Sequence, residues 1–587
     1  MQISYKVSIP HPSTHQVVVE IRGKKPLNCN ELTFFLPRWS PGSYLIREYS
    51  RHLSKLEAFN QLGEPLYFKQ NDISTFELSF TKFTCQNPID EFLIRYQVYC
   101  KELTVRTSHV DESHAFLHLP TLLMGLLNEH NNAPFQMGKS DVSDRIQIEF
   151  QFPPIFQKIS TGLKELSGFP RDRFVYSADS YDELIDCPVE IGCQETDGFL
   201  VDGVEHELAY YGKMLPFDHP LKNDYQKIVQ YILKYMQGAP YERYVFITHF
   251  IQGLGGGLEH LNSTALQFCP FQLQSRKGYL NYLNLVSHEF FHLWNVKRIR
   301  PFELGPFDYL KEAYTSMLWL AEGLTSLMDE LFVYQAELMT KEEYLDFQKD
   351  NLNRYISVQG KKFHSLEQSS ENAWIKLYRP DENSNNSSIS YYLKGGIVFW
   401  CLHILLSEKN AGIRQVILDM WESYKSHPEH GLKKEDVYAL VEKWGGELIL
   451  SKFQSMIETT EEIDLETIAR KAGINIAWEA DSFVLGADFE FSHDRVLIKS
   501  VHLDGAFFDA GLNAGDEILA IDGMRVLKDR MQEASKFLLP EKRYLLTISR
   551  LGVLLEKSLV LKVGIRKIKE LTVFDQHLFT KVFNEKI

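Results

Sequence analysis

The segment His288-Glu289-Phe290-Phe291-His292 places two histidines four residues apart, with a glutamate directly after the first. On a helix, residues four apart lie one turn above each other on the same face, so two imidazoles at this spacing can bind one metal ion. Glu289 would lie near the metal without binding it, where it can take a proton from a water molecule. Taken alone, the match can also arise by chance on an ordinary helix.

A catalytic zinc ion needs a third protein ligand and one open coordination position. Glu322 is a candidate, because it interrupts an otherwise apolar helical segment 30 residues beyond His292. A carboxylate in such surroundings needs a partner, since burying a lone charge is costly. Two alternatives stay open, namely an exposed helical glutamate and a structural zinc site. The set of two histidines and one glutamate favours a catalytic site.

Two further clusters contain groups that could bind a substrate. Gly255-Gly256-Gly257 is followed by Glu259, and glycines let a backbone approach a ligand while a glutamate can bind an ammonium group. The run does not fit a phosphate-binding loop, because no Gly-Lys-Ser/Thr follows; a flexible turn is the simple alternative. In the second cluster, Tyr392 could donate a hydrogen bond to a developing oxyanion, with Tyr391 as its rival.

These residues lie in a chain of 587 residues, which is long enough for three or four domains. The net charge of -15 argues against nucleic-acid binding, because phosphate recognition needs a basic face. No window is apolar enough to predict a membrane helix, and the first residues lack the pattern of a secretory signal. Seven cysteines without a C-x-x-C pair favour free thiols, so we expect a cytoplasmic protein that does not bind membranes.

Hydrophobic periodicity predicts a multidomain α+β protein. Residues 1–168 read as an N-terminal β-sandwich-like domain, with alternation at 146–152. Residues 169–475 read as an α+β and largely helical catalytic domain, with helical patterns at 221–237, 279–296 and 314–335. Residues 476–565 return to short strands, and 566–587 form a C-terminal tail.

The chain resembles the glycyl aminopeptidase family of gluzincin zinc metallopeptidases. The resemblance rests on Pro37–Tyr44 (PRWSPGSY), Gly256–His260 (GGLEH), His288–Pro301 (HEFFHLWNVKRIRP), Trp319–Ser326 (WLAEGLTS) and Tyr391–Gly395 (YYLKG). It implies an N-terminal β domain, a thermolysin-like catalytic domain and a C-terminal PDZ domain. Ala510–Gly523 carries the PDZ resemblance.

The resemblance also implies a reaction and a role for each matching residue. The reaction is the release of N-terminal residues from peptides with a free N-terminus, with a preference for Gly, or for Gly and Ala. His288, His292 and Glu322 match the ligands of one Zn²⁺ per chain, and Glu289 matches the general base. Glu259 matches the residue that binds the substrate ammonium group, and Tyr392 matches the oxyanion-binding tyrosine. Gly256 and Gly257 are expected to contact the substrate backbone.

Three questions stay open at the level of sequence. An endopeptidase is the first alternative, with Glu259 only stabilising its loop. A catalytically silent scaffold that binds peptides through the PDZ-like domain is the second. The third concerns that domain itself: its expected carboxylate-binding loop, Val484–Ala487, departs from the usual Gly-Leu-Gly-Phe pattern. It either captures a peptide or packs against the catalytic domain.

Overall fold

A computed structural model describes residues 3–82, 89–127, 145–170, 173–213, 219–479, 483–492, 494–527, 538–564 and 566–584. Its contacts divide the chain into two compact units. The first contains residues 1–314, 336–338 and 421–432, and the second contains 315–335, 339–420 and 433–587. Each unit is described by itself. Across the described residues, no helix is both long and apolar enough to span a membrane.

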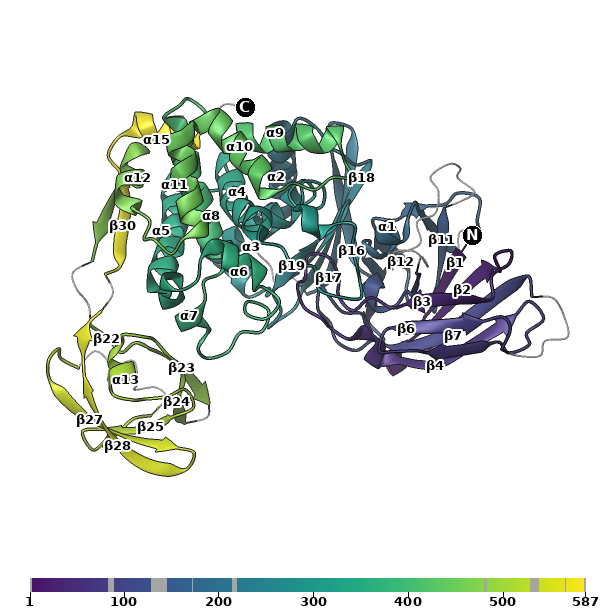
Figure 1. Cartoon of the computed structure of the whole chain (residues 1–587), viewed down its shortest axis with the longest axis horizontal. Helices are drawn as coiled ribbons and strands as arrows, with labels where there is room; N and C mark the ends of the chain where they lie inside the picture. Colours follow the sequence, from purple (N-terminus) through teal and green to yellow (C-terminus); the bar gives the residue numbers. More distant parts are fainter. Residues whose placement is uncertain are drawn as a thin grey trace. The chain divides into compact units, whose positions relative to one another are not determined.

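The first unit begins with a β-rich domain built around a seven-stranded sheet, drawn in purple and blue in Figure 1. Four of its strands alternate between buried and part-exposed residues, because one face covers a core and the other meets solvent. In sheet order the seven strands are β13 (Lys164–Glu165), β14 (Phe174–Ala178), β11 (Ile146–Gln151), β1 (Ile3–Ser8), β2 (Gln16–Lys24), β7 (Glu91–Tyr99) and β4 (Leu53–Asn60). This confirms the expected N-terminal β domain.

Two four-stranded sheets complete this domain. One contains β10 (Gly125–Leu126), β3 (Glu31–Phe35), β6 (Thr75–Ser79) and β5 (Tyr67–Gln70). The other contains β12 (Lys158–Thr161), β15 (Val189–Gly192), β9 (His114–Leu117) and β8 (His109–Val110), with α1 (Tyr181–Ile185) leading into β15. Residues from all three sheets share one hydrophobic core.

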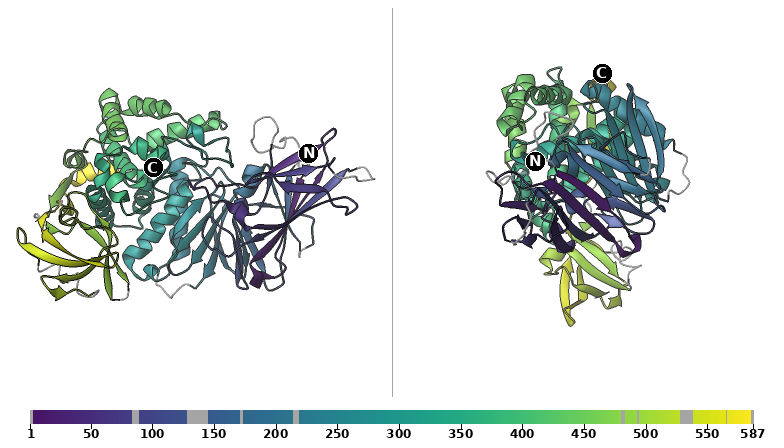
Figure 2. Two further views of the ribbon diagram at one scale, coloured as in Figure 1. Left: turned by 60° about the horizontal axis from the view of Figure 1, so that its bottom comes forward. Right: turned by 90° about the vertical axis from the view of Figure 1, so that its right-hand side faces the viewer.

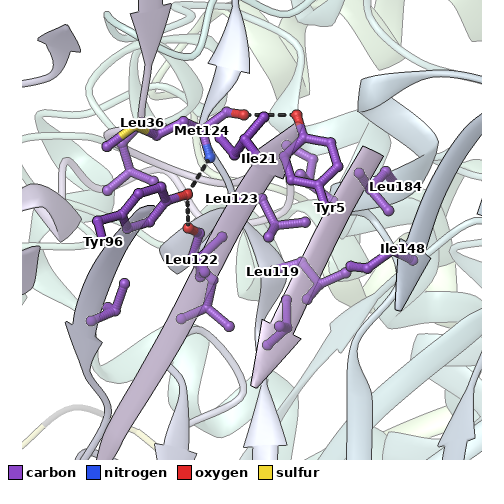
Figure 3. Packing of buried hydrophobic residues seen from close by; sticks show 14 of the residues in the cluster. Tyr5, Ile21, Leu36, Tyr96, Leu119, Leu122, Leu123, Met124, Ile148 and Leu184 are labelled. Carbon is purple, nitrogen blue, oxygen red and sulfur yellow. Dashed lines mark hydrogen bonds between the residues drawn. The ribbon is translucent and has the colours of Figure 1, made fainter. Parts of the chain in front are cut away.

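Two tyrosine hydroxyls lie inside that core and are paired with backbone groups (Figure 3). Tyr5 donates to the Met124 carbonyl at 2.8 Å. Tyr96 donates to the Leu122 carbonyl at 2.7 Å and accepts from the Met124 amide at 3.1 Å. A buried hydroxyl without a partner would be costly, so these bonds fix segment 119–124 against the sheet. The same segment begins directly after His118.

A second sheet in the first unit supports the expected catalytic motifs. Its order is β16 (Glu195–Val201), β17 (Val204–Gly212), β18 (Arg243–Phe250), β20 (Ser263–Phe268) and β19 (Gly256–Glu259). β17, β18 and β20 are parallel, and β19 runs antiparallel at the edge. Helices α2 (Leu221–Met236) and α3 (Arg276–Phe291) contact each other and the sheet (Figures 1 and 2).

The second unit contains helices packed around α8 (Tyr391–Ser407), whose residues are almost all buried. Its other helical elements are a π-helical turn (Trp319–Gly323), α4 (Leu324–Gln335), α5 (Lys341–Ser357), α6 (Leu366–Glu371), α7 (Ser384–Ser387), α10 (Lys434–Gly445), α11 (Glu447–Glu458), α12 (Leu465–Lys471) and α15 (Gln576–Phe583). Helix α9 spans Ile413–Ser426. The helical pattern expected at 314–335 is therefore a π-helical turn followed by an α-helix.

The second unit also contains a PDZ-like sheet, with β23 (Ala487–Ser492), β24 (Arg495–Val501), β25 (Glu517–Ile521), β27 (Arg543–Arg550) and β28 (Val553–Val560). β26 (Met524–Arg525) pairs with β25, β22 (Phe483–Val484) pairs with β29 (Lys562–Val563), and α13 (Ala506–Asp509) follows β24. The Asn386 side chain donates to the Val501 carbonyl at 2.7 Å and accepts from the Leu503 amide at 2.9 Å. This domain therefore contacts the helical part of its own unit.

The end of the chain returns to the helices. β30 (Ile568–Val573) pairs with β21 (Ile474–Trp478), so the strands entering and leaving the PDZ-like domain lie together. In α15, Phe579, Val582 and Phe583 are buried. The segment expected as a tail thus contains a strand and a helix, because its apolar residues at helical spacing can cover α8.

Candidate active site

Helix α3 presents the two histidines of the metal motif. The Ser275 hydroxyl caps its start by accepting from the Gly278 amide. His288 is half-buried, His292 is buried, and their ring centroids lie 4.5 Å apart. His292 Nδ1 lies 2.7 Å from the Asn295 carbonyl, an arrangement in which Nδ1–H donates and Nε2 keeps the lone pair that can bind a metal. The expected spacing on one helix is present.

The helix ends at Phe291, although the periodicity predicted helix to residue 296. In a continuing helix, the Asn295 carbonyl would accept from the Ile299 amide. Here the Asn295 carbonyl is hydrogen-bonded to the His292 ring instead, and the Ile299 amide donates to the Trp294 carbonyl at 2.7 Å. Arg298 is half-buried and donates to the Leu293 carbonyl at 2.7 Å, just beyond the end of the helix. The early end thus orients a metal-ligand candidate.

Three buried side chains of the first unit meet at one point. One carboxylate oxygen of Glu259, one of Glu289 and one ring nitrogen of His292 all lie within 4.8 Å of one another. Glu289 comes from α3 and Glu259 from the edge strand β19, so the sheet and the helix both contribute. The expected general base and the expected ammonium-binding residue therefore lie beside a metal-ligand candidate.

Glycines make this close approach possible. Gly257 lies on β19, and a Cβ atom there would overlap the Glu289 carboxylate. Gly42, in the loop after β3, has a φ of +83°, and a Cβ there would overlap the Glu259 carboxylate. Gly256 and Gly257 thus belong to a strand rather than a loose turn, and Arg106 donates to the Gly257 carbonyl at 3.2 Å. The β domain contacts the site through both Gly42 and Arg106.

The second unit places Glu322 in the π-helical turn Trp319–Gly323, where only 2% of the residue is exposed. Such turns are rare and are found mostly at functional sites. The turn packs on the start of α8 through a contact between two glycines. A Cβ on Gly323 would lie 2.6 Å from the Gly395 Cα. Any larger residue at either position would separate Glu322 from the first turn of α8.

Tyr391 and Tyr392 open α8, which Ser390 caps by accepting from the amides of Tyr392 and Leu393. Tyr391 is fully buried, whereas Tyr392 is part-exposed, and their rings stack with centroids 4.8 Å apart. Of the two hydroxyls, that of Tyr392 is better placed to meet a ligand. Both residues share the second unit with Glu322.

The donors at this site are imidazole nitrogens and carboxylate oxygens, which are ordinary ligands of zinc. One ring nitrogen of His292 is already oriented by a carbonyl, as is usual for metal-binding histidines. Two further carboxylates lie beside it. The residues present therefore fit a zinc ion. The π-helical turn, the early end of α3 and the contact of Gly42 with Glu259 carry no sequence pattern that would have revealed them.

Comparisons with known proteins agree with this arrangement. Residues 281–398 match the M61 glycyl aminopeptidase family, residues 4–193 match the Peptidase M61 N-terminal domain, and residues 484–561 match the PDZ domain. No curated protein matches the sequence. An aminopeptidase N family protein from Idiomarina loihiensis has 25% sequence identity and a TM-score of 0.90, with 100% of both chains covered.

A more distant structure shares the fold. It is an M1 zinc metallopeptidase variant from Deinococcus radiodurans bound to a Tyr-Ser-Ala substrate, with 11% identity and a TM-score of 0.50. The comparison covers 79% of this chain and 95% of that one.

Proposed function

Because the chain belongs to the M61 glycyl aminopeptidase family and is a zinc aminopeptidase, we propose that it removes the first residue of peptides with a free N-terminus, Gly in preference and then Ala. The observation that carries this proposal is the grouping of Glu259, Glu289 and His292 within 4.8 Å. A proton-transfer group and an anionic partner for a cation lie there beside one metal-ligand candidate. That combination suits cleavage next to an ammonium group.

We assign the zinc ligands to His288, His292 and Glu322, a set of two imidazoles and one carboxylate. When bound, zinc acidifies a coordinated water and polarises the scissile carbonyl. Glu289 takes a proton from the attacking water and later delivers it to the leaving amine. Its burial excludes bulk water from this transfer, and its contact with Gly257 holds the carboxylate in one place.

The remaining residues position the peptide. The outer edge of β19 is unpaired in the described sheet, so the substrate backbone can add to it as a further strand beside Gly256 and Gly257. Glu259 binds the ammonium group, which leaves room for one residue before the scissile bond. Tyr392 donates a hydrogen bond to the oxyanion that forms at the carbonyl.

A panel of aminoacyl reporter substrates, free and N-acetylated, tests the proposal with and without a zinc chelator. We expect chelator-sensitive release from free Gly and Ala substrates only. Cleavage of blocked peptides would instead identify an endopeptidase. No cleavage by a chain that holds one zinc ion would indicate a peptide-binding scaffold.

A further inference from the structure

A small cavity adjoins Glu259 inside the first unit. It has a volume of about 100 Å³ and its walls include Trp39, Gly42, His118, Glu259, His260 and Tyr309. We call it the Glu259 cavity. About half of its lining residues come from the β domain, and Glu259 is shared between this cavity and the cluster with Glu289 and His292.

Several polar atoms on the cavity wall are buried without a hydrogen bond. Among the described residues, neither ring nitrogen of His118 has a partner, and the same holds for His260 Nε2 and Glu259 Oε1. These residues are only 1%, 2% and 4% exposed. Leaving buried polar atoms unpaired costs free energy, so such a cluster calls for a ligand that supplies the missing partners.

Other polar groups on the same wall are hydrogen-bonded, and Asp186 is at the centre of these bonds. Asp186 accepts from Lys297 Nζ at 2.7 Å and from the Leu261 amide at 2.9 Å, and it lies 3.2 Å from His260 Nδ1. His260 therefore has one ring nitrogen engaged and directs the other away from Asp186. The rings of His118 and His260 lie 6.4 Å apart between centroids. Because these hydrogen bonds hold the cavity wall in place, the unpaired atoms on it do not result from loose packing.

The chemistry of these atoms suits a cation with several N–H donors. Glu259 supplies a negative charge, and a neutral imidazole supplies one acceptor nitrogen. Burial is the largest cause that holds the pKa of His118 well below its usual value, so its ring is neutral and offers one acceptor nitrogen. A primary ammonium group has three donors, which match one carboxylate oxygen, one nitrogen of His118 and the Nε2 of a neutral His260 whose Nδ1–H is directed at Asp186.

We propose that the Glu259 cavity receives the first residue of the peptide and that His118 and His260, together with Glu259, bind its ammonium group. This inference rests on the proposed aminopeptidase function. It makes the β domain part of the substrate site, because His118 follows β9 and Gly42 supports Glu259. It also limits the size of the side chain of that first residue.

The size of the cavity sets this limit. A cavity of about 150 Å³ holds a benzene ring, and this cavity is smaller and also holds the ammonium group. We therefore expect small first residues to fit this cavity and aromatic ones to be disfavoured. The aromatic rings of Trp39 and Tyr309 lie on the cavity wall with their centroids 6.3 Å apart. Because both residues are buried, their rings have little room to move away from a larger ligand.

Ligand binding to the zinc-loaded full chain tests the role of His118 without relying on turnover. Calorimetry would compare glycinamide with glycolamide, in which a hydroxyl replaces the ammonium group. We expect His118→Phe to weaken glycinamide binding about tenfold or more, to leave glycolamide binding unchanged, and to be partly rescued in His118→Asn. Equal losses for both ligands, or no loss, would overturn the assignment.

A milder pair of variants tests the size of the cavity if His118 variants do not fold. Ile185 lines the cavity, and Ile191 lies in the same hydrophobic core away from it. Ile185→Val should raise kcat/KM for Ala and Val reporters relative to Gly at least threefold, while Ile191→Val should leave the ratio unchanged. Identical ratios in both variants would overturn the cavity assignment. A wild-type chain that cleaves no free peptide would instead refute the proposed function.

Discussion

The Glu289 carboxylate lies directly against the Cα of Gly257, so the edge strand β19 and the helix α3 meet without an intervening side chain. This contact sets the position of the proposed general base relative to the strand that would pair with substrate. Two glycines only two positions apart in the sequence, Gly255 and Gly257, therefore differ in their effect on the position of Glu289.

Gly257→Ala should inactivate the enzyme without unfolding it. Its backbone conformation is open to alanine, because its φ is not positive, but the added methyl group would displace Glu289. A displacement of about 1 Å in a catalytic group can cost a factor of about 100 in rate. Gly255→Ala is the matched control, since nothing lies within 4 Å of its position. Similar kcat values for both variants would show that the contact does not position the base.

Glu289→Gln should keep zinc and lose turnover. The amide preserves the shape of the side chain but cannot accept the proton of the attacking water, and general-base catalysis contributes about 10²–10⁴-fold. Metal analysis and kcat for a free glycyl reporter would be measured on the same preparation. A metal-free protein, or one with full activity, would refute the assignment of Glu289 as base.

Gly42→Ala should reproduce the effect of Glu259→Ala. Glu259→Ala is expected to raise KM for free-amino substrates far more than it raises the inhibition constant Ki of N-acetylated peptides, because it removes the partner of the ammonium group. At Gly42 the added methyl group would displace the same carboxylate. Gly63→Ala is the control, because its φ of +80° brings the same backbone strain with nothing within 4 Å. If KM for free substrates and Ki for N-acetylated peptides rise equally, the role of Glu259 is structural.

Tyr392→Phe and Tyr391→Phe should differ, although the two residues are neighbours. Loss of one donor to an oxyanion costs about 10²–10³ in kcat, with little change in KM. Tyr392 is part-exposed and is expected to show this loss, whereas Tyr391 is fully buried and should affect stability more than rate. Steady-state kinetics on both variants decide between them. A larger loss of kcat in Tyr391→Phe would reverse the assignment.

Local patterns in the sequence predicted the elements better than the contacts between them. The histidine spacing and the helical pattern at 279–296 predicted helix α3. They did not predict its end at Phe291, beyond which the His292 ring bonds to the Asn295 carbonyl. Likewise, the contact of Gly42 with Glu259 joins residues more than 200 positions apart, and no periodicity encodes such a distance.

Lys394 belongs to the Tyr391–Gly395 motif but has a structural position. It is 1% exposed, and its ammonium group donates to the Thr459 carbonyl at 3.2 Å. Burial lowers the pKa of Lys394 to about 8, with Glu462 acting in the opposite direction. The folded-state pKa thus lies below the unfolded value of 10.5. The charged lysine therefore destabilises the folded state below pH 8, and this cost disappears as the pH rises from 8 to 10.5.

Lys394→Met should consequently stabilise the protein at pH 7. A shift of this size corresponds to about 3 kcal/mol, from which the lost hydrogen bond to Thr459 subtracts about 1 kcal/mol. Urea unfolding of both proteins at pH 7, 8 and 9 should show a gain of about 2 kcal/mol that shrinks at the higher pH values. Lys349→Met is the control: a hydrogen bond to Asp346 raises the pKa of Lys349, so its removal brings no gain. A destabilised Lys394→Met variant would mean that the lysine is needed to hold α8 against Thr459, and with it the first turn that carries Tyr392.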